Sequence, residues 1–90
     1  MADEKQPAPI DFYTFVLSLG SSAFVHLGDA PHPETGELAQ ANLLLAKQTI
    51  DILSMLAEKT KGNLTDEEAR FLENLLTDLR LRYVGKSSGR

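Results

Sequence analysis

Cysteine is absent from the sequence, which excludes disulfides and thiolate metal ligands and leaves no sign of an oxidising compartment. The sequence also lacks any uninterrupted apolar run near the ~20 residues that a membrane-spanning helix needs. Its N-terminus from Met1 to Pro9 is polar and broken by proline, without the apolar run of a secretory signal. We therefore expect a cytoplasmic protein that does not insert into membranes.

Basic residues are few, with 9 Lys and Arg against 13 Asp and Glu and a formal net charge of −4 over 90 residues. No basic stripe is present, because Lys59 and Lys61 stand beside the acidic run Asp66 to Glu68. A field of this sign repels nucleic acid rather than attracting it. We expect no nucleic-acid partner.

Residues that carry chemistry are equally sparse. No Gly-rich phosphate loop follows a strand, because no strand is predicted. The serines at 18, 21 and 22 have only His26 nearby as a base, and no oxyanion donor is identifiable. The sequence predicts a non-enzymatic protein with no catalytic residue and no cofactor.

The stretch from Glu58 to Glu68 predicts where one helix ends and the next begins. Gly62 follows a helical pattern and can adopt the left-handed conformation that closes a helix, so the helix should end near Lys61. Thr65 and Glu68 have the spacing of a capping box, which places the next helix start at Asp66.

The hydrophobic periodicity on either side of this junction, and in the N-terminal half of the chain, predicts the complete fold. Helices are predicted over Asp11 to Leu27, Asn42 to Lys61 and Asp66 to Val84, with Gly28 and Gly85 ending the first and third. The fold class is all-α, a small three-helix bundle with a C-terminal antiparallel helical hairpin, and dimerisation is left open. The domain covers 11–84 between flexible tails at 1–10 and 85–90. The segment from Gly28 to Ala41 is a loop, with one turn of helix expected at Glu37 to Gln40.

The first predicted helix has more apolar surface than a small bundle needs to bury. Its apolar residues span an arc of roughly 200°, which leaves one flank for another surface. The candidate interaction surface consists of Tyr13, Leu17, Gly20 and Phe24. The small residues from Gly20 to Ala23 fit either close approach of a partner or tight packing inside the monomer, and both interpretations stay open. The expected partner is a second copy, in a homodimer or higher assembly, or another protein.

The two histidines lie near the loop and suggest an alternative function. The candidate loop site consists of His26, His32 and Glu34, with Asp29 close by in sequence. Their spacing matches no helical pair of metal ligands and no calcium loop, so no metal site is predicted and a structural histidine at 26 is the simpler interpretation. The alternative function is a helical protein that binds a small molecule or a metal through this loop.

Several separate blocks resemble one protein family. They include Phe12-x-x-Phe15, His26-Leu27-Gly28, Pro31-x-Pro33-x-Thr35-Gly36 and Lys59-Thr60-Lys61-Gly62-Asn63-Leu64-Thr65. In this order, from Asp11 to Val84, the chain resembles an uncharacterised family of short bacterial proteins, domain of unknown function 1844. The resemblance implies a bacterial origin and a small helical fold. The family has no established activity, so the resemblance carries over no functional residue.

Overall fold

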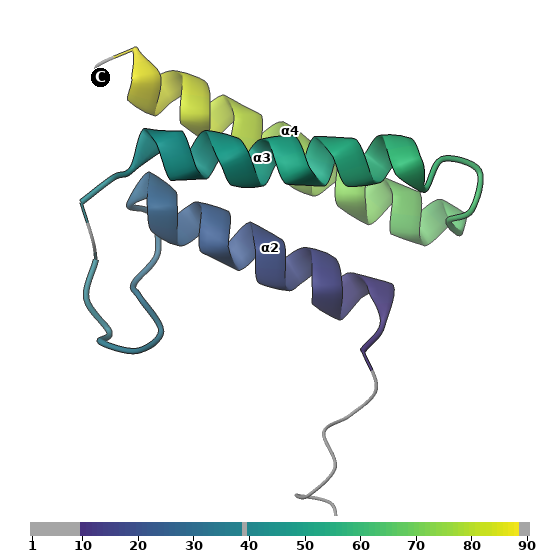
Figure 1. Cartoon of the computed structure of the whole chain (residues 1–90), viewed down its shortest axis with the longest axis horizontal. Coiled ribbons are helices and arrows are strands. Elements are labelled where there is room, and N and C mark those ends of the chain that lie inside the picture. Colours follow the sequence, from purple (N-terminus) through teal and green to yellow (C-terminus); the bar gives the residue numbers. More distant parts are fainter. Residues whose placement is uncertain (1–9, 39, 89–90) are drawn as a thin grey trace, which may run out of the picture.

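Three α-helices and one ordered loop form the structure, a computed structural model that describes residues 10–38 and 40–88. The helices are α2, Phe12–Leu27, α3, Leu43–Lys59, and α4, Asp66–Ser87. All three pairs of helices pack against one another, and α3 runs antiparallel to both of its neighbours (Figure 1). The predicted all-α fold with a C-terminal helical hairpin is confirmed. The N-terminal tail, apart from its last residue, and the last two residues lie outside the described part of the chain.

Helix α2 begins and ends where the sequence predicts. The Asp11 side chain accepts a hydrogen bond of 2.8 Å from the backbone N–H of Thr14, which caps the helix and lowers the pKa of the Asp11 carboxyl. At the other end Gly28 has a φ of 82° and its N–H donates to the carbonyls of Phe24 and Val25. A residue with a Cβ would be strained in that conformation, so glycine fixes the end of the helix.

The turn between α3 and α4 contains the predicted capping box. The Glu68 N–H donates to Thr65 Oγ1 at 3.0 Å, and the Thr65 N–H donates to Glu68 Oε1 at 2.9 Å. Helix α3, however, ends at Lys59, two residues before the predicted end. The Thr60 hydroxyl bonds the carbonyl of Leu56 at 2.8 Å, and Gly62 adopts its positive φ of 85° inside the turn rather than at the helix end.

The predicted end of the third helix is wrong. Helix α4 continues through Gly85 to Ser87, so the tail does not begin at 85. The extension places Lys86 Nζ 2.8 Å from Asp29 Oδ1, and the same carboxyl accepts a bond of 3.2 Å from Arg82. These contacts come from a residue far away in sequence and stabilise the last turn despite the glycine.

The core lies on the axis between the three helices. Each helix contributes a stripe of aliphatic side chains with spacings of three and four residues, and Gly20 lies buried among them. A Cβ placed on Gly20 would lie 2.8 Å from Cδ2 of Leu75, so α4 uses the space that this glycine leaves. Burial of one such aliphatic side chain contributes about 1.5–3 kcal/mol. The buried aliphatic residues are Val16, Ala23, Leu27, Ala46, Ile50, Leu53, Leu72, Leu76 and Leu79.

The loop between α2 and α3 lies beside the C-terminal end of α2 (Figure 1), and a hydrogen bond joins its two ends. The Asn42 N–H donates to the carbonyl of His26 at 2.7 Å, which joins the two ends of the loop. An isolated antiparallel bridge pairs Pro31 with Leu38, and the His32 N–H donates to the Glu37 carbonyl at 2.9 Å. The helical turn expected from 37 is therefore wrong, because Glu37 and Leu38 pair across the loop instead.

Candidate functional site

A groove of about 560 Å³ lies between the outer side of α2 and the loop. Three serines of α2 and Val25 line it from the helix, while the segment Ala30 to Pro33 lines it from the loop. We call this hollow the α2 groove. Its complete lining is Ser18, Ser21, Ser22, Phe24, Val25, His26, Ala30, Pro31, His32 and Pro33.

Among the described residues, no Asp, Glu, Lys or Arg side chain lines the α2 groove. The lack of charge extends to the whole of α2, whose 16 residues include none of these four types. A surface helix normally carries charged residues on its solvent side. The exposed residues of α2 are instead aromatic, aliphatic or hydroxyl-bearing, namely Tyr13, Thr14, Phe15, Leu17, Ser18, Ser21 and Ser22.

The loop side of the groove is held by its own hydrogen bonds. The bridge between Pro31 and Leu38 and the bond from Gly36 N–H to the His32 carbonyl, 2.7 Å long, fix the segment opposite α2. The His32 Nδ1 accepts a bond of 3.3 Å from the Glu34 N–H, which restrains the imidazole. Two prolines further reduce the freedom of this segment. The groove is therefore largely formed before anything binds.

Two of the three predicted loop-site residues come together in the groove. His26 and His32 both line it, whereas Glu34 is exposed at the loop tip and does not. The neighbouring Asp29 is paired with Arg82 and Lys86, and the hydrogen bond from Lys86 is the main cause of its lowered pKa. Nowhere in residues 10–38 and 40–88 do three or more histidine, cysteine or carboxylate side chains converge as a metal site requires.

The four residues of the predicted interaction surface have different environments. Gly20 is buried against Leu75, so packing inside the monomer accounts for this part of the small-residue run. The Arg82 guanidinium covers Phe24, with Cζ 5.0 Å from the ring centroid. Tyr13 makes an edge-to-face contact with Phe71 of α4, their centroids 5.3 Å apart. Leu17 is 52% exposed and remains available to a partner.

Sequence reasoning does not find most of the groove. In the sequence the three serines are considered as nucleophiles, and Ser21 and Ser22 also belong to the small-residue run from Gly20 to Ala23. In the structure the Ser18 hydroxyl donates to the Phe15 carbonyl at 2.7 Å. Within the loop wall the sequence analysis singles out only His32, and nothing in the sequence pattern marks Val25, Ala30, Pro31 or Pro33 as part of a binding surface. The signal that could have found them is the complete lack of charge in α2, since its polar positions are filled mainly by hydroxyl residues.

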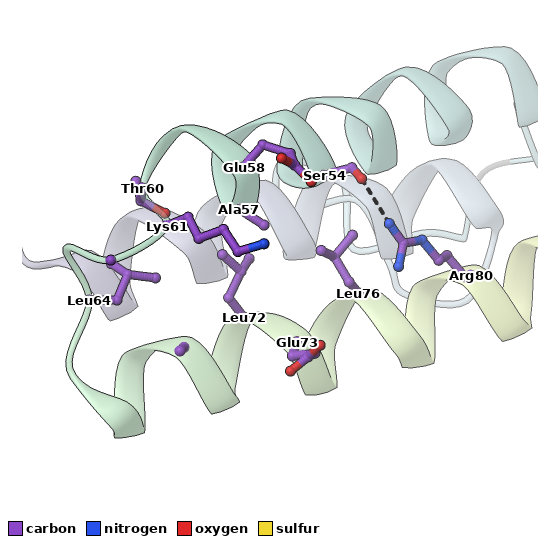
Figure 2. Close-up of a pocket in the computed structure, with 12 residues that line it drawn as sticks. Ser54, Ala57, Glu58, Thr60, Lys61, Leu64, Leu72, Glu73, Leu76 and Arg80 are labelled. Carbon is purple, nitrogen blue, oxygen red and sulfur yellow. Dashed lines mark hydrogen bonds between the residues drawn. The ribbon is translucent and has the colours of Figure 1, made fainter.

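A second hollow of about 370 Å³ lies between α3 and α4 near their turn (Figure 2). Its floor includes Leu72 and Leu76, both almost fully buried, and polar or charged residues make up half of its lining. Figure 2 shows Lys61 extending along the hollow from the turn, and Arg80 bonded to Ser54 at 2.8 Å. Two carboxylates, Glu58 and Glu73, complete the rim. With both signs of charge present in equal number, this hollow selects neither anions nor cations.

The fold and the groove define a class: a small helical bundle with one uncharged surface helix beside an ordered loop. Within this class, the chain belongs to the family described as Domain of unknown function (DUF1844), whose model matches residues 9–85. No curated protein and no solved structure matched the chain. None of the helices in the described part of the chain combines the length and apolar character needed to cross a bilayer.

Proposed function

We propose that this protein is a non-enzymatic protein–protein interaction module of the bacterial cytoplasm, and that it binds its partner through the exposed side of α2. The observation that carries the proposal is the absence of charged side chains from α2. The centres of protein interfaces are depleted of charge and enriched in aromatic and aliphatic side chains. The exposed side of α2 has this composition, whereas the exposed sides of α3 and α4 carry charged residues.

The argument depends on what the fold alone requires. Folding requires an apolar inner side on α2 but sets no such requirement on the outer side. Lysine or glutamate there would have a helix propensity at least as high as that of serine. Exposed apolar residues on α3 and α4, such as Leu44 and Leu81, each have at least one charged residue within one helical turn and are ordinary. On α2 the exposed Phe15 and Leu17 have no charged neighbour in the same helix.

The test is site-specific photocross-linking in living cells, which captures a partner whatever its identity. A photoreactive side chain at Ser21, on the exposed side of α2, is expected to give protein adducts. The matched control is Thr77, an exposed hydroxyl residue on α4. Adducts that form equally at both positions, or at neither, contradict the proposal. In a second experiment the photoreactive side chain is placed at Ser18 and combined with either Ser21→Lys or Thr77→Lys, which add the same charge to α2 or to α4. Only Ser21→Lys should abolish the adducts.

A second candidate function uses the same groove for a small molecule. It is favoured by one observation, the presence of two imidazoles and apolar walls around a hollow of about 560 Å³. Native mass spectrometry of the purified protein, compared with a variant carrying His26→Gln and His32→Gln, separates the two functions. A co-purifying small molecule lost from the double variant supports ligand binding. A protein adduct at Ser21 that persists in the double variant supports the interaction module.

A further inference from the structure

The charge of the chain narrows the choice of partner for α2. The formal net charge is −4, so two copies repel one another at long range, and contact is least unfavourable where neither copy presents a carboxylate. The exposed side of α2 is such a surface. A partner with a charged interface would find no charged side chain in α2 or in the groove lining and would lose hydration of its own charges. The surface therefore fits a partner that is itself uncharged, and this chain provides one.

Helix α2 carries both a projecting side chain and a hollow. Leu17 is half exposed and lies one helical turn before Ser21, while the α2 groove occupies the C-terminal half of the helix. Between them the small side chains of Ser18 and Ser21 permit close approach of a second helix, since the distance between packed helices depends on the side chains at the contact. A projection and a hollow on one helix fit a two-fold interface, because the projection of each copy can then occupy the hollow of the other.

We infer that the partner is a second copy of this chain, with the two α2 helices packed antiparallel and Leu17 of each copy inserted into the α2 groove of the other. The inference rests on the proposed function and assigns its partner. An antiparallel crossing near Ser21 places the N-terminal half of one α2 over the C-terminal half of the other, so both leucines reach the grooves at once. The loop segment Ala30 to Pro33 then contacts the partner's helix as a side wall.

The size of this surface sets the expected strength. A helix of 16 residues is ~24 Å long, and with an exposed side ~10–12 Å wide it offers on the order of 250–300 Å² per copy before the loop is added. Standard interfaces bury about 800 Å² per partner, so this dimer falls among the small, reversible ones. We expect a monomer–dimer equilibrium in the micromolar range of concentration rather than a permanent dimer.

The natural absence of cysteine makes the geometry directly testable. Ser21→Cys introduces the only thiol of the chain, and mild oxidation or a short thiol cross-linker should give a covalent dimer in high yield. The control variant is Thr77→Cys, on the exposed side of α4, which should form little or no covalent dimer at the same protein concentration. A covalent dimer formed equally by both variants overturns the inference, because it indicates random collision.

The contact of Leu17 is tested by the mass in solution, measured by light scattering over a range of concentrations. Leu17→Glu should weaken dimerisation by about 100-fold or more, since both leucines of the dimer change at once, and Leu17→Ala by about ten-fold. Leu81→Glu, an equivalent change at an exposed leucine of α4, should leave the equilibrium unchanged. Circular dichroism confirms that each variant is folded.

The outcomes separate this inference from the proposed function. A dimer that cross-links at Ser21 and is weakened by Leu17→Glu supports both. A dimer unaffected by Leu17→Glu overturns the inference. A monomer at every concentration up to millimolar also overturns it, and if the photoreactive side chain at Ser21 still captures another protein in cells, the proposed function stands with a different partner.

Discussion

Helices α2 and α4 both place aliphatic side chains in the core, yet their outer sides differ in the number of charged residues. Helix α4 is charged along its length, from Asp66 and Glu67 in its first turn to Lys86 in its last, and α2 has no charged residue at all. The inner sides are alike because every helix of a bundle must bury an apolar stripe. The outer sides are not constrained by folding. Folding alone therefore does not account for the difference, and the proposed interaction surface on α2 rests on it.

The largest expected effects concern the inner sides, where the two helices should behave alike. Leu27 of α2 and Leu79 of α4 are both completely buried. Leu27→Ala and Leu79→Ala should each lower the free energy of unfolding by about 2–5 kcal/mol, through lost burial and the cavity left behind. Urea unfolding followed by circular dichroism measures the loss. A small loss in one helix and a large one in the other would show that the inner sides are not equivalent.

The two helical glycines should respond in opposite directions. Gly20 of α2 faces Leu75, whereas a Cβ added to Gly85 of α4 would meet no atom within 4 Å. Gly20→Leu should destabilise the fold by about 1–3 kcal/mol through overpacking, and Gly85→Ala should stabilise it by about 0.5–1 kcal/mol because alanine favours the helix. Thermal unfolding of the two variants measures both changes. Shifts of Tm in the same direction would contradict this account.

The N-terminal caps differ in kind, and that of α4 is the more elaborate. Thr65 and Glu68 satisfy each other's backbone N–H groups, whereas α2 relies on the Asp11 side chain. Thr65→Ala should lower the free energy of unfolding by about 1 kcal/mol because the N–H of Glu68 loses its acceptor. Thr65→Ser, which keeps the hydroxyl, is the control and should be close to neutral. Chemical denaturation of the three proteins decides between these outcomes.

The smallest expected effect tests the contact between the end of α2 and α4. Hydrogen bonds from Lys86 and then Arg82 lower the pKa of Asp29 below its usual 3.8. The ionised carboxylate is therefore favoured in the folded state, and its contribution to stability is present above about pH 4 and is lost as the pH falls through the lowered value. Asp29→Asn should lower Tm at neutral pH and flatten the fall of Tm in acid. Glu34→Gln, at the exposed loop tip, should retain the wild-type pH profile.

Local signals were enough to predict the fold. The capping box at Thr65, the N-cap at Asp11 and the stop at Gly28 are determined by neighbouring residues, and all three are confirmed. The end of α4 could not be predicted because it depends on Asp29, more than fifty residues away in sequence. Sequence reasoning treats Gly85 as a stop, whereas the ion pair at Lys86 keeps the helix intact.

The candidate site was predictable only in part. The excess of apolar surface on α2 was apparent from the sequence, but periodicity does not show which flank a neighbouring helix covers. Arg82 of α4 covers Phe24, and Leu75 fills the space beside Gly20. Both contacts depend on how α4 is rotated against α2. The groove itself depends on how the loop segment from Ala30 to Pro33 folds beside α2, which periodicity does not show either.

The hydrogen bond between Asn42 and His26 closes the loop at its base, so the length of the loop does not set the spacing of α2 and α3. A doubling of loop length costs only about 0.6 kcal/mol of closure entropy. The tip around Gly36, where a Cβ would meet no atom within 4 Å, can therefore accept inserted residues while the helices keep their register. Family members with longer loops would then have the same helical bundle and differ in the accessibility of α2. The tip also offers a place to insert an affinity tag.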